Sequence, residues 1–117
     1  MATTWQVWVE AARPRTLALA LATAGLGLAL AWGDGYRNWP VVLLTLLTAT
    51  LLQILSNLAN DYGDSLHGAD SSVRAGPQRA VQSGRVTRAA MRRAVILVVV
   101  LSMLSGLALV LLAFGAA

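Results

Sequence analysis

The chain contains no cysteine, no lysine and few charged residues of any kind. The absence of cysteine excludes disulfide bonds, thiolate metal sites and cysteine nucleophiles. Charged residues make up 12% of the 117 residues, whereas soluble globular proteins contain about 25%. Apolar residues make up 57%, above the usual level of roughly 45–50%. A chain with this balance does not form an ordinary solvated surface, so its composition predicts an integral membrane protein.

Three apolar runs, at 16–32, 40–59 and 94–115, have the length of membrane-spanning helices. A helix needs about 20 residues to cross a hydrocarbon core about 30 Å thick, and it satisfies its own backbone hydrogen bonds there. The sequence therefore predicts an all-α membrane protein with three transmembrane helices in one domain. Thr87 is the predicted N-cap of a third helix that begins near Arg88. Small residues in the first and third runs favour close approach of neighbouring helices; they are Gly25, Gly27, Ser102, Ser105 and Gly106.

A cleaved signal peptide is the alternative interpretation of the first run. Two arginines precede this run, and Ala29-Leu30-Ala31 has the small-x-small form of a cleavage site. However, the run is longer than the apolar part of a usual signal peptide, and two more spanning runs follow it. A retained span is therefore favoured.

The distribution of arginine predicts the orientation of the spans. Two arginines precede the first run, one lies between the first and second runs, and six lie between the second and third. By the positive-inside rule, the N-terminus and the loop at 60–93 face the cytoplasm, and the hairpin at 33–39 lies outside. A basic patch is also typical of nucleic-acid binding, but these arginines lie directly between two spanning runs, which disfavours that function.

Three of the five acidic residues, Asp61, Asp64 and Asp70, lie within ten positions at the end of the second run. If the helix continues through this stretch, Asn57, Asp61 and Asp64 share one face, with Asn60 beside them. Adjacent carboxylates repel one another, and ionisable groups near a membrane interior are usually functional. Oxygen ligands of this kind suit Mg²⁺, which is commonly completed by water and by substrate phosphates.

The alternative is that these residues are solvated charges and that the arginines contact anionic lipid headgroups. An Asp-x-x-Asp pair alone is weak evidence for a site. The nearby Asn57 and Asn60, together with the downstream Arg74 and Arg79, strengthen it, because guanidinium groups bind phosphate oxygens in a bidentate way. The combination favours a magnesium–diphosphate site at one membrane face.

Four stretches of the chain form a recognisable pattern: Asn60-Asp61-Tyr62-Gly63-Asp64, Gly68-Ala69-Asp70, Arg74-Ala75-Gly76-Pro77-Gln78-Arg79-Ala80-Val81-Gln82-Ser83-Gly84 and Ala12-Arg13-Pro14-Arg15-Thr16-Leu17. With them, the segment 57–84 resembles the first aspartate-rich region of UbiA-type membrane prenyltransferases. Within that superfamily it is similar to the dihydroxynaphthoate prenyltransferases of menaquinone biosynthesis. The broader superfamily pattern has a third aspartate where this chain has Gly68, with Asp70 two residues later, which favours the naphthoate branch.

This resemblance implies a Mg²⁺-dependent enzyme of the inner cell membrane. Such an enzyme transfers a polyprenyl group from polyprenyl diphosphate to 1,4-dihydroxy-2-naphthoate. Asp61 and Asp64 are then catalytic residues that hold Mg²⁺ on the diphosphate, and Asp70 is a further metal ligand. The implied substrate-binding residues are Asn57, Asn60, Arg74 and Arg79.

The resemblance also implies that the chain is incomplete, because it corresponds to the first third of a bundle of roughly nine helices. The second aspartate-rich region of that bundle is not found in the sequence. The remaining helices are then expected from missing residues or from a partner chain, and the three spans alone are expected to be inactive. The rival functions are a different Mg²⁺-dependent membrane enzyme, such as a phospholipid-headgroup phosphotransferase, and a non-catalytic three-span subunit or anionic-lipid-binding protein.

Overall fold

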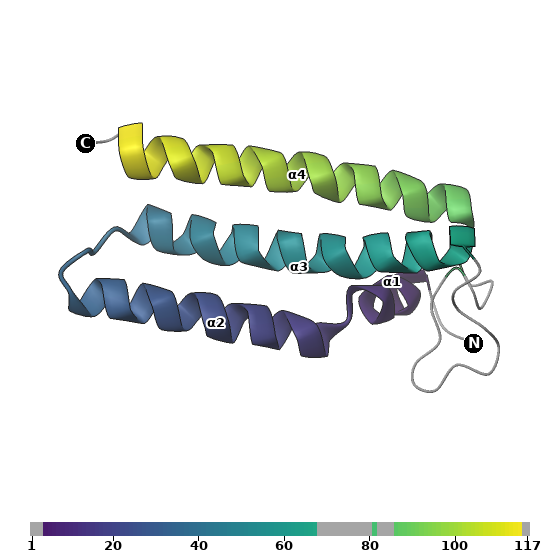
Figure 1. Cartoon of the computed structure of the whole chain (residues 1–117), viewed down its shortest axis with the longest axis horizontal. Coiled ribbons are helices and arrows are strands. Elements are labelled where there is room, and N and C mark those ends of the chain that lie inside the picture. Colours follow the sequence, from purple (N-terminus) through teal and green to yellow (C-terminus); the bar gives the residue numbers. More distant parts are fainter. Residues whose placement is uncertain (1–3, 68–80, 82–85, 116–117) are drawn as a thin grey trace.

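The computed structural model describes residues 4–67, 81 and 86–115. These residues form four helices, α1 (Thr4–Ala12), α2 (Pro14–Gly33), α3 (Trp39–His67) and α4 (Arg88–Gly115). The three long helices lie side by side, with α3 between α2 and α4, and α1 lies near the end where α3 finishes (Figure 1). Each long helix has the length and apolar composition to cross a membrane. The predicted all-α fold with three such helices is therefore confirmed.

The helix ends follow local capping chemistry. Pro14 opens α2, because its fixed φ and missing N–H suit the first helical position. The Asn38 side-chain oxygen accepts a hydrogen bond from the Val41 N–H (3.3 Å) and caps α3. The Thr87 hydroxyl accepts one from the Ala90 N–H (3.1 Å) at the start of α4. The predicted N-cap at Thr87 is confirmed.

Segment 60–93, predicted as a cytoplasmic loop, is helical at both ends. Residues 60–67 continue α3, and residues 88–93 form the first turns of α4. Figure 1 places the end of α3 and the start of α4 at the same end of the molecule as α1, and the hairpin between α2 and α3 at the opposite end. The arrangement therefore agrees with three successive crossings.

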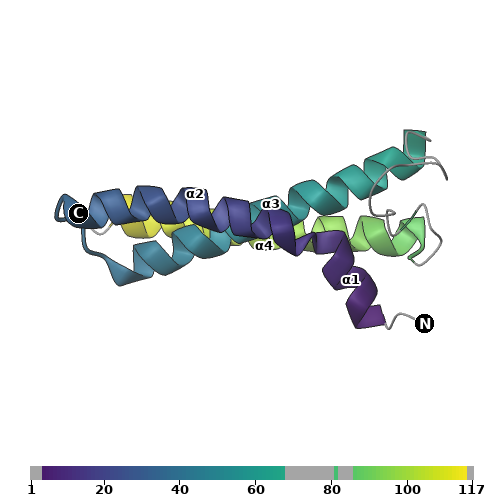
Figure 2. The same cartoon turned by 90° about the horizontal axis from the view of Figure 1, so that it is seen from below.

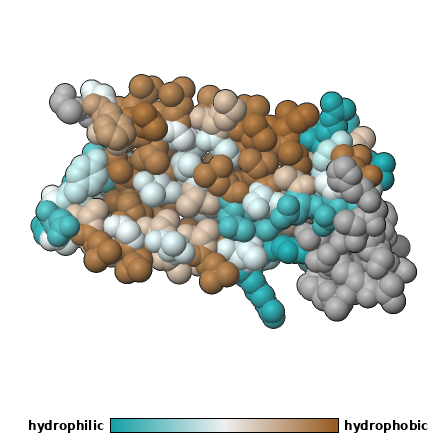
Figure 3. All heavy atoms as spheres, in the orientation of Figure 1, coloured by the Kyte–Doolittle hydropathy of each residue, from teal (hydrophilic) through white to brown (hydrophobic). Residues whose placement is uncertain are grey.

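The outer surface of the long helices is apolar. Most large aliphatic side chains of α2 and α4 are exposed, among them Leu19, Leu26, Leu107 and Leu111. Figure 3 shows this as hydrophobic colour over the middle of the molecule, with hydrophilic colour toward its two ends and around α1. Exposed apolar area of this extent is unfavourable in water but matches a surrounding of lipid tails.

Small and hydroxyl side chains mediate the contact between α3 and α4. The hydroxyls of Thr48 and Ser105 are 2.6 Å apart and form an interhelical hydrogen bond. A Cβ atom added to Gly106 would lie 3.9 Å from the Thr48 methyl carbon, an ordinary van der Waals distance, so Gly106 lies beside α3. A Cβ built at Gly25 or Gly27 has no such neighbour within 4 Å. The expected contact of small residues with a neighbouring helix is therefore seen for Ser105 and Gly106 of α4 but not for these two glycines of α2.

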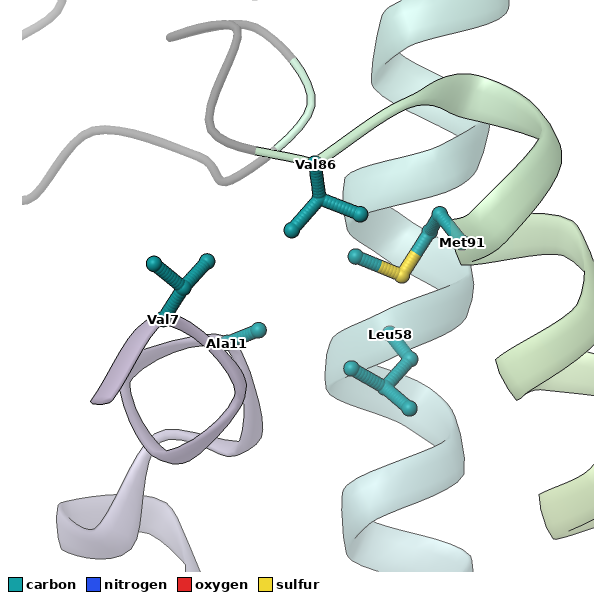
Figure 4. Packing of buried hydrophobic residues seen from close by; sticks show 5 residues of the cluster. All are labelled: Val7, Ala11, Leu58, Val86 and Met91. Carbon is teal, nitrogen blue, oxygen red and sulfur yellow. The ribbon is translucent and has the colours of Figure 1, made fainter. Parts of the chain in front are cut away.

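A compact apolar cluster joins α1 to the ends of α3 and α4. Val7 and Ala11 of α1 meet Leu58 of α3 and Met91 of α4, with Val86 closing the group (Figure 4). Met91 is completely buried. The helix α1 was not predicted from the sequence. Its side with Val7 and Ala11 packs in this cluster, which lies beyond the apolar middle of the bundle.

Substitution of Met91 by Ala is expected to destabilise the packed end of the molecule. Removal of a buried methionine side chain costs about 2–5 kcal/mol, because the lost apolar contacts leave a cavity. Met103→Ala is the matched control, because Met103 lies on the same helix but is 69% exposed. Unfolding in detergent, followed by circular dichroism, measures both variants. Equal loss of stability from the two substitutions would contradict the packing described for α1.

Candidate metal and diphosphate site

The helix α3 is longer than a membrane crossing requires. Its 29 residues span about 43 Å at a rise of 1.5 Å per residue, against a hydrocarbon core about 30 Å thick. Its final turns carry Asn57, Asn60, Asp61 and Asp64. The prediction that the second helix continues through the acidic stretch is confirmed, so these side chains project from a regular helix.

The four side chains lie on one side of α3, but their exposure differs. At 3.6 residues per turn they fall within an arc of about 100°. Asn57 is 4% exposed and Asp61 is 2% exposed, whereas Asp64 is half-buried and Asn60 is exposed. One edge of the arc therefore packs against the rest of the molecule, and the other edge is open.

Asp61 lies at the packed edge and contacts the segment that follows α3. Its side-chain oxygen Oδ1 accepts a hydrogen bond from the Val81 N–H at 3.2 Å. This bond joins positions twenty residues apart in the sequence. Asp61 therefore holds residue 81 beside the end of α3, a role that the spacing of aspartates does not predict.

Asn57 bridges α3 to the corner between α1 and α2. Its amide nitrogen donates to the carbonyl oxygen of Ala12 (2.8 Å) and to the hydroxyl of Thr16 (2.7 Å). The Thr16 hydroxyl in turn donates to the carbonyl oxygen of Arg13 (2.9 Å). The predicted contact between Asn57 and substrate stays a prediction, and the observed partners of its amide nitrogen belong to the corner.

The corner itself contains a strained backbone conformation. Arg13 has φ 54° and ψ 78°, in the left-handed region. That conformation is unusual for a residue with a side chain, and residues before proline also prefer extended backbone. Strain of this kind costs about 1–3 kcal/mol and persists only where surrounding contacts enforce it. The hydrogen bonds from Thr16 and Asn57 are such contacts.

An arginine at the start of α4 supports the end of α3. The Arg88 guanidinium nitrogen Nη2 donates to the carbonyl oxygen of Ser65 at 2.7 Å. The last carbonyls of a helix lack partners within the helix, and a positive charge near them is favourable. Arg88 therefore stabilises the turn of α3 next to Asp64 and holds α4 close to it.

The donor chemistry of this helix end fits a magnesium ion. Asp61 and Asp64 supply two carboxylates, and the exposed Asn60 adds an amide oxygen on the same side of α3. Mg²⁺ needs only one or two carboxylates, because water and phosphate oxygens complete its octahedron. The described residues contain no cluster of three or more acidic, histidine or cysteine side chains placed to hold a metal. Asp61 and Asp64 are the described carboxylates that would hold the ion.

The structure places the predicted site residues in three groups. It places Asn60, Asp61 and Asp64 on one side of the last turns of α3, and it turns Asn57 toward the corner. Asp70, Arg74 and Arg79 lie outside the described residues, so their metal and phosphate roles stay predictions. Thr16 and the Val81 amide were missed by sequence reasoning. Both belong to stretches that carry the family resemblance, and that was the available signal for them.

Comparison with known proteins finds one matching family and several relatives that share one name. The model of the UbiA prenyltransferase family matches residues 18–117. A 1,4-dihydroxy-2-naphthoate octaprenyltransferase of Escherichia coli is 56% identical over 108 residues, which cover 92% of this chain and 35% of that protein. The enzyme of the same name from Haemophilus influenzae is 46% identical over 112 residues, or 93% of this chain and 36% of the relative.

A third relative, the 1,4-dihydroxy-2-naphthoate octaprenyltransferase of Mycobacterium tuberculosis, is 43% identical over 105 residues, or 90% of this chain and 36% of its own length. No solved structure gives a significant match. The chain spans about a third of the length of the curated relatives it matches. With the family model aligned from residue 18 to residue 117, including the end of α3, the chain belongs to the UbiA prenyltransferase family.

Proposed function

We propose that this chain is the part of a longer prenyltransferase that supplies its first metal–diphosphate motif. The proposed reaction is transfer of a polyprenyl group from polyprenyl diphosphate to 1,4-dihydroxy-2-naphthoate in menaquinone biosynthesis. The observation that carries this proposal is the placement of Asp61, Asp64 and Asn60 on one side of an apolar spanning helix, at its end. The names of the relatives support the choice of acceptor.

The reaction breaks the bond between the allylic carbon and the diphosphate oxygen, and diphosphate leaves with the bonding electrons. A carbon of the naphthalene ring then bonds to the allylic carbon, and the acceptor carboxylate leaves as carbon dioxide. Mg²⁺, when bound, would neutralise the charge that develops on the departing diphosphate. Asp61 and Asp64 hold the ion at the end of α3, and Asn60 orients the diphosphate from the open edge.

Three further residues complete the proposed site. Asp70 adds a carboxylate, and Arg74 and Arg79 contact phosphate oxygens through their guanidinium forks. The apolar surface of the long helices suits the other end of the substrate, because a polyprenyl tail is as hydrophobic as the leucine side chains exposed there. The proposed site therefore lies at the boundary between polar surroundings for the diphosphate and apolar surroundings for the polyprenyl tail.

Substitution of Asp64 by Asn tests the proposed role of the helix end. In a full-length protein carrying this segment, we expect the rate of Mg²⁺-dependent product formation to fall roughly 10²–10³-fold, because removal of one preorganised electrostatic group has about that effect. Asp34→Asn is the matched control, because Asp34 lies at the opposite end, just after α2. Mass spectrometry of prenylated naphthoate in membranes gives the readout.

The 117-residue chain alone, tested beside the full-length protein, is expected to give no product, because the proposal takes the remaining helices from further residues or a partner chain. Full activity of Asp64→Asn, or product from the purified short chain, would contradict this account. A correctly inserted full-length protein without any activity would instead favour a non-catalytic membrane subunit or an anionic-lipid-binding protein.

We also propose that α1 and the end of α3 face the cytoplasm, in the inner membrane. The six arginines between the second and third spans support this orientation. The chain has no cysteine, so single cysteines at Leu66 and Tyr36, both about half exposed and at opposite ends, report the two sides. A membrane-impermeant thiol reagent applied to spheroplasts is expected to label position 36 and spare position 66. The reverse pattern would contradict the orientation.

A further inference from the structure

We propose that Asn57 is a positioning residue, which locks the corner between α1 and α2 onto the aspartate-bearing turns of α3 and so fixes the metal–diphosphate site. This inference rests on the proposed function for the role of the site. It assigns Asn57 a different task from the substrate contact predicted from sequence. The residue acts through Ala12 and Thr16, not through the substrate.

The first support is the set of partners that Asn57 has. Its side chain is almost completely buried, and its amide nitrogen reaches two acceptors on different parts of the corner, at 2.8 and 2.7 Å. Its side-chain oxygen lies 3.5 Å from the amide nitrogen of Gln53, one turn earlier in α3. A buried amide with these partners is a structural connection between α3 and the N-terminal segment.

The second support is the position of this connection along α3. Asn57 lies four residues before Asp61, on the same side of the helix. The neighbouring Leu58 packs against Val7 and Ala11 of α1. Beyond this point α2 no longer runs beside α3, and α1 turns away from the axis of α2 (Figure 2). The corner held by Asn57 therefore decides whether α1 lies against the turns that carry the aspartates.

The third support is the strain at Arg13. A residue with a side chain leaves the left-handed conformation unless its neighbours enforce it. Without the Asn57 amide, the partly buried carbonyl of Ala12 and hydroxyl of Thr16 lose a hydrogen-bond donor. The corner is then expected to relax, α1 to move from Leu58, and Asp61 to lose its packed surroundings.

The first test measures the distance between α1 and α3 in the absence of metal and diphosphate. Nitroxide labels on cysteines at Trp5 and Leu52, both exposed, are read by double electron–electron resonance in the full-length protein. We expect a narrow distance distribution in the parent and a broadened one in Asn57→Leu, which has a similar shape but no donor. Thr16→Val, a milder change at the same corner, is expected to broaden it in part.

The second test measures Mn²⁺ affinity in the presence of inorganic diphosphate, by electron paramagnetic resonance titration. We expect Asn57→Leu to weaken binding roughly tenfold or more, the usual effect of losing a residue that supports metal ligands. Thr16→Val should act in the same direction, and the double variant should weaken binding by less than the sum of the two single effects, because the two residues share one hydrogen bond. Asn38→Leu is the control, because it removes the N-cap of α3 at the far end and lowers stability without touching the corner.

Weakened Mn²⁺ binding by Asn57→Leu with an unchanged distance distribution would overturn the positioning role in favour of direct ligand contact. Additive effects of the Thr16 and Asn57 substitutions on affinity would overturn it as well, and so would an equal effect from Asn38→Leu. The distance and affinity readouts do not require turnover. An inactive parent protein with the expected distances and Mn²⁺ affinities would therefore refute the proposed reaction and leave the role of Asn57 supported.

Discussion

The candidate site depends on the packing of the polar end of α3. With 29 residues, α3 is about 13 Å longer than a hydrocarbon core of roughly 30 Å is thick, and α4 is nearly as long. Asn57 with the corner, the apolar cluster around Met91, and Arg88 at the last carbonyls all contact the C-terminal turns of α3. The candidate site is built on the turns that these contacts hold.

The same contacts divide the polar face of α3 into two parts. The edge with Asn57 and Asp61 is buried, with Asn57 bonded to the corner and Asp61 to residue 81, and the edge with Asn60 remains open. A site for a diphosphate headgroup needs both properties, because carboxylates must be held in place and the ligand must be able to reach them. Packing and function therefore use adjacent positions of one helix.

Much of the fold was predictable from the sequence, because a bilayer permits few backbone solutions. The scarcity of charged residues and the three long apolar runs were sufficient to predict the three spans. Thr87, as an N-cap residue, was sufficient to predict the start of α4. Helical periodicity also predicted that Asn60, Asp61 and Asp64 lie on one side of α3. The residue types and their spacing predicted the candidate site, whereas the identity of the acceptor was predicted from the family resemblance.

The remaining features depend on tertiary contacts that leave little trace in local sequence. The helix α1 has only nine residues, and its apolar side is defined by a cluster contributed by α3 and α4. The partners of Asn57 lie more than forty positions away, so its spacing from the aspartates gave no sign of these hydrogen bonds. The small residues of α2 and α4 look alike in sequence, yet only those of α4 meet a described neighbour.

The most direct test of the account locates the bound metal relative to α3. Mn²⁺ in place of Mg²⁺, bound with a polyprenyl diphosphate in the full-length protein, gives distances to a nitroxide at position 66 or at position 36 by pulsed electron paramagnetic resonance. The account predicts a short distance to position 66, next to the aspartate-bearing turns, and a long one to position 36 at the hairpin. A metal close to the hairpin, or no metal bound in the presence of the diphosphate, would contradict it.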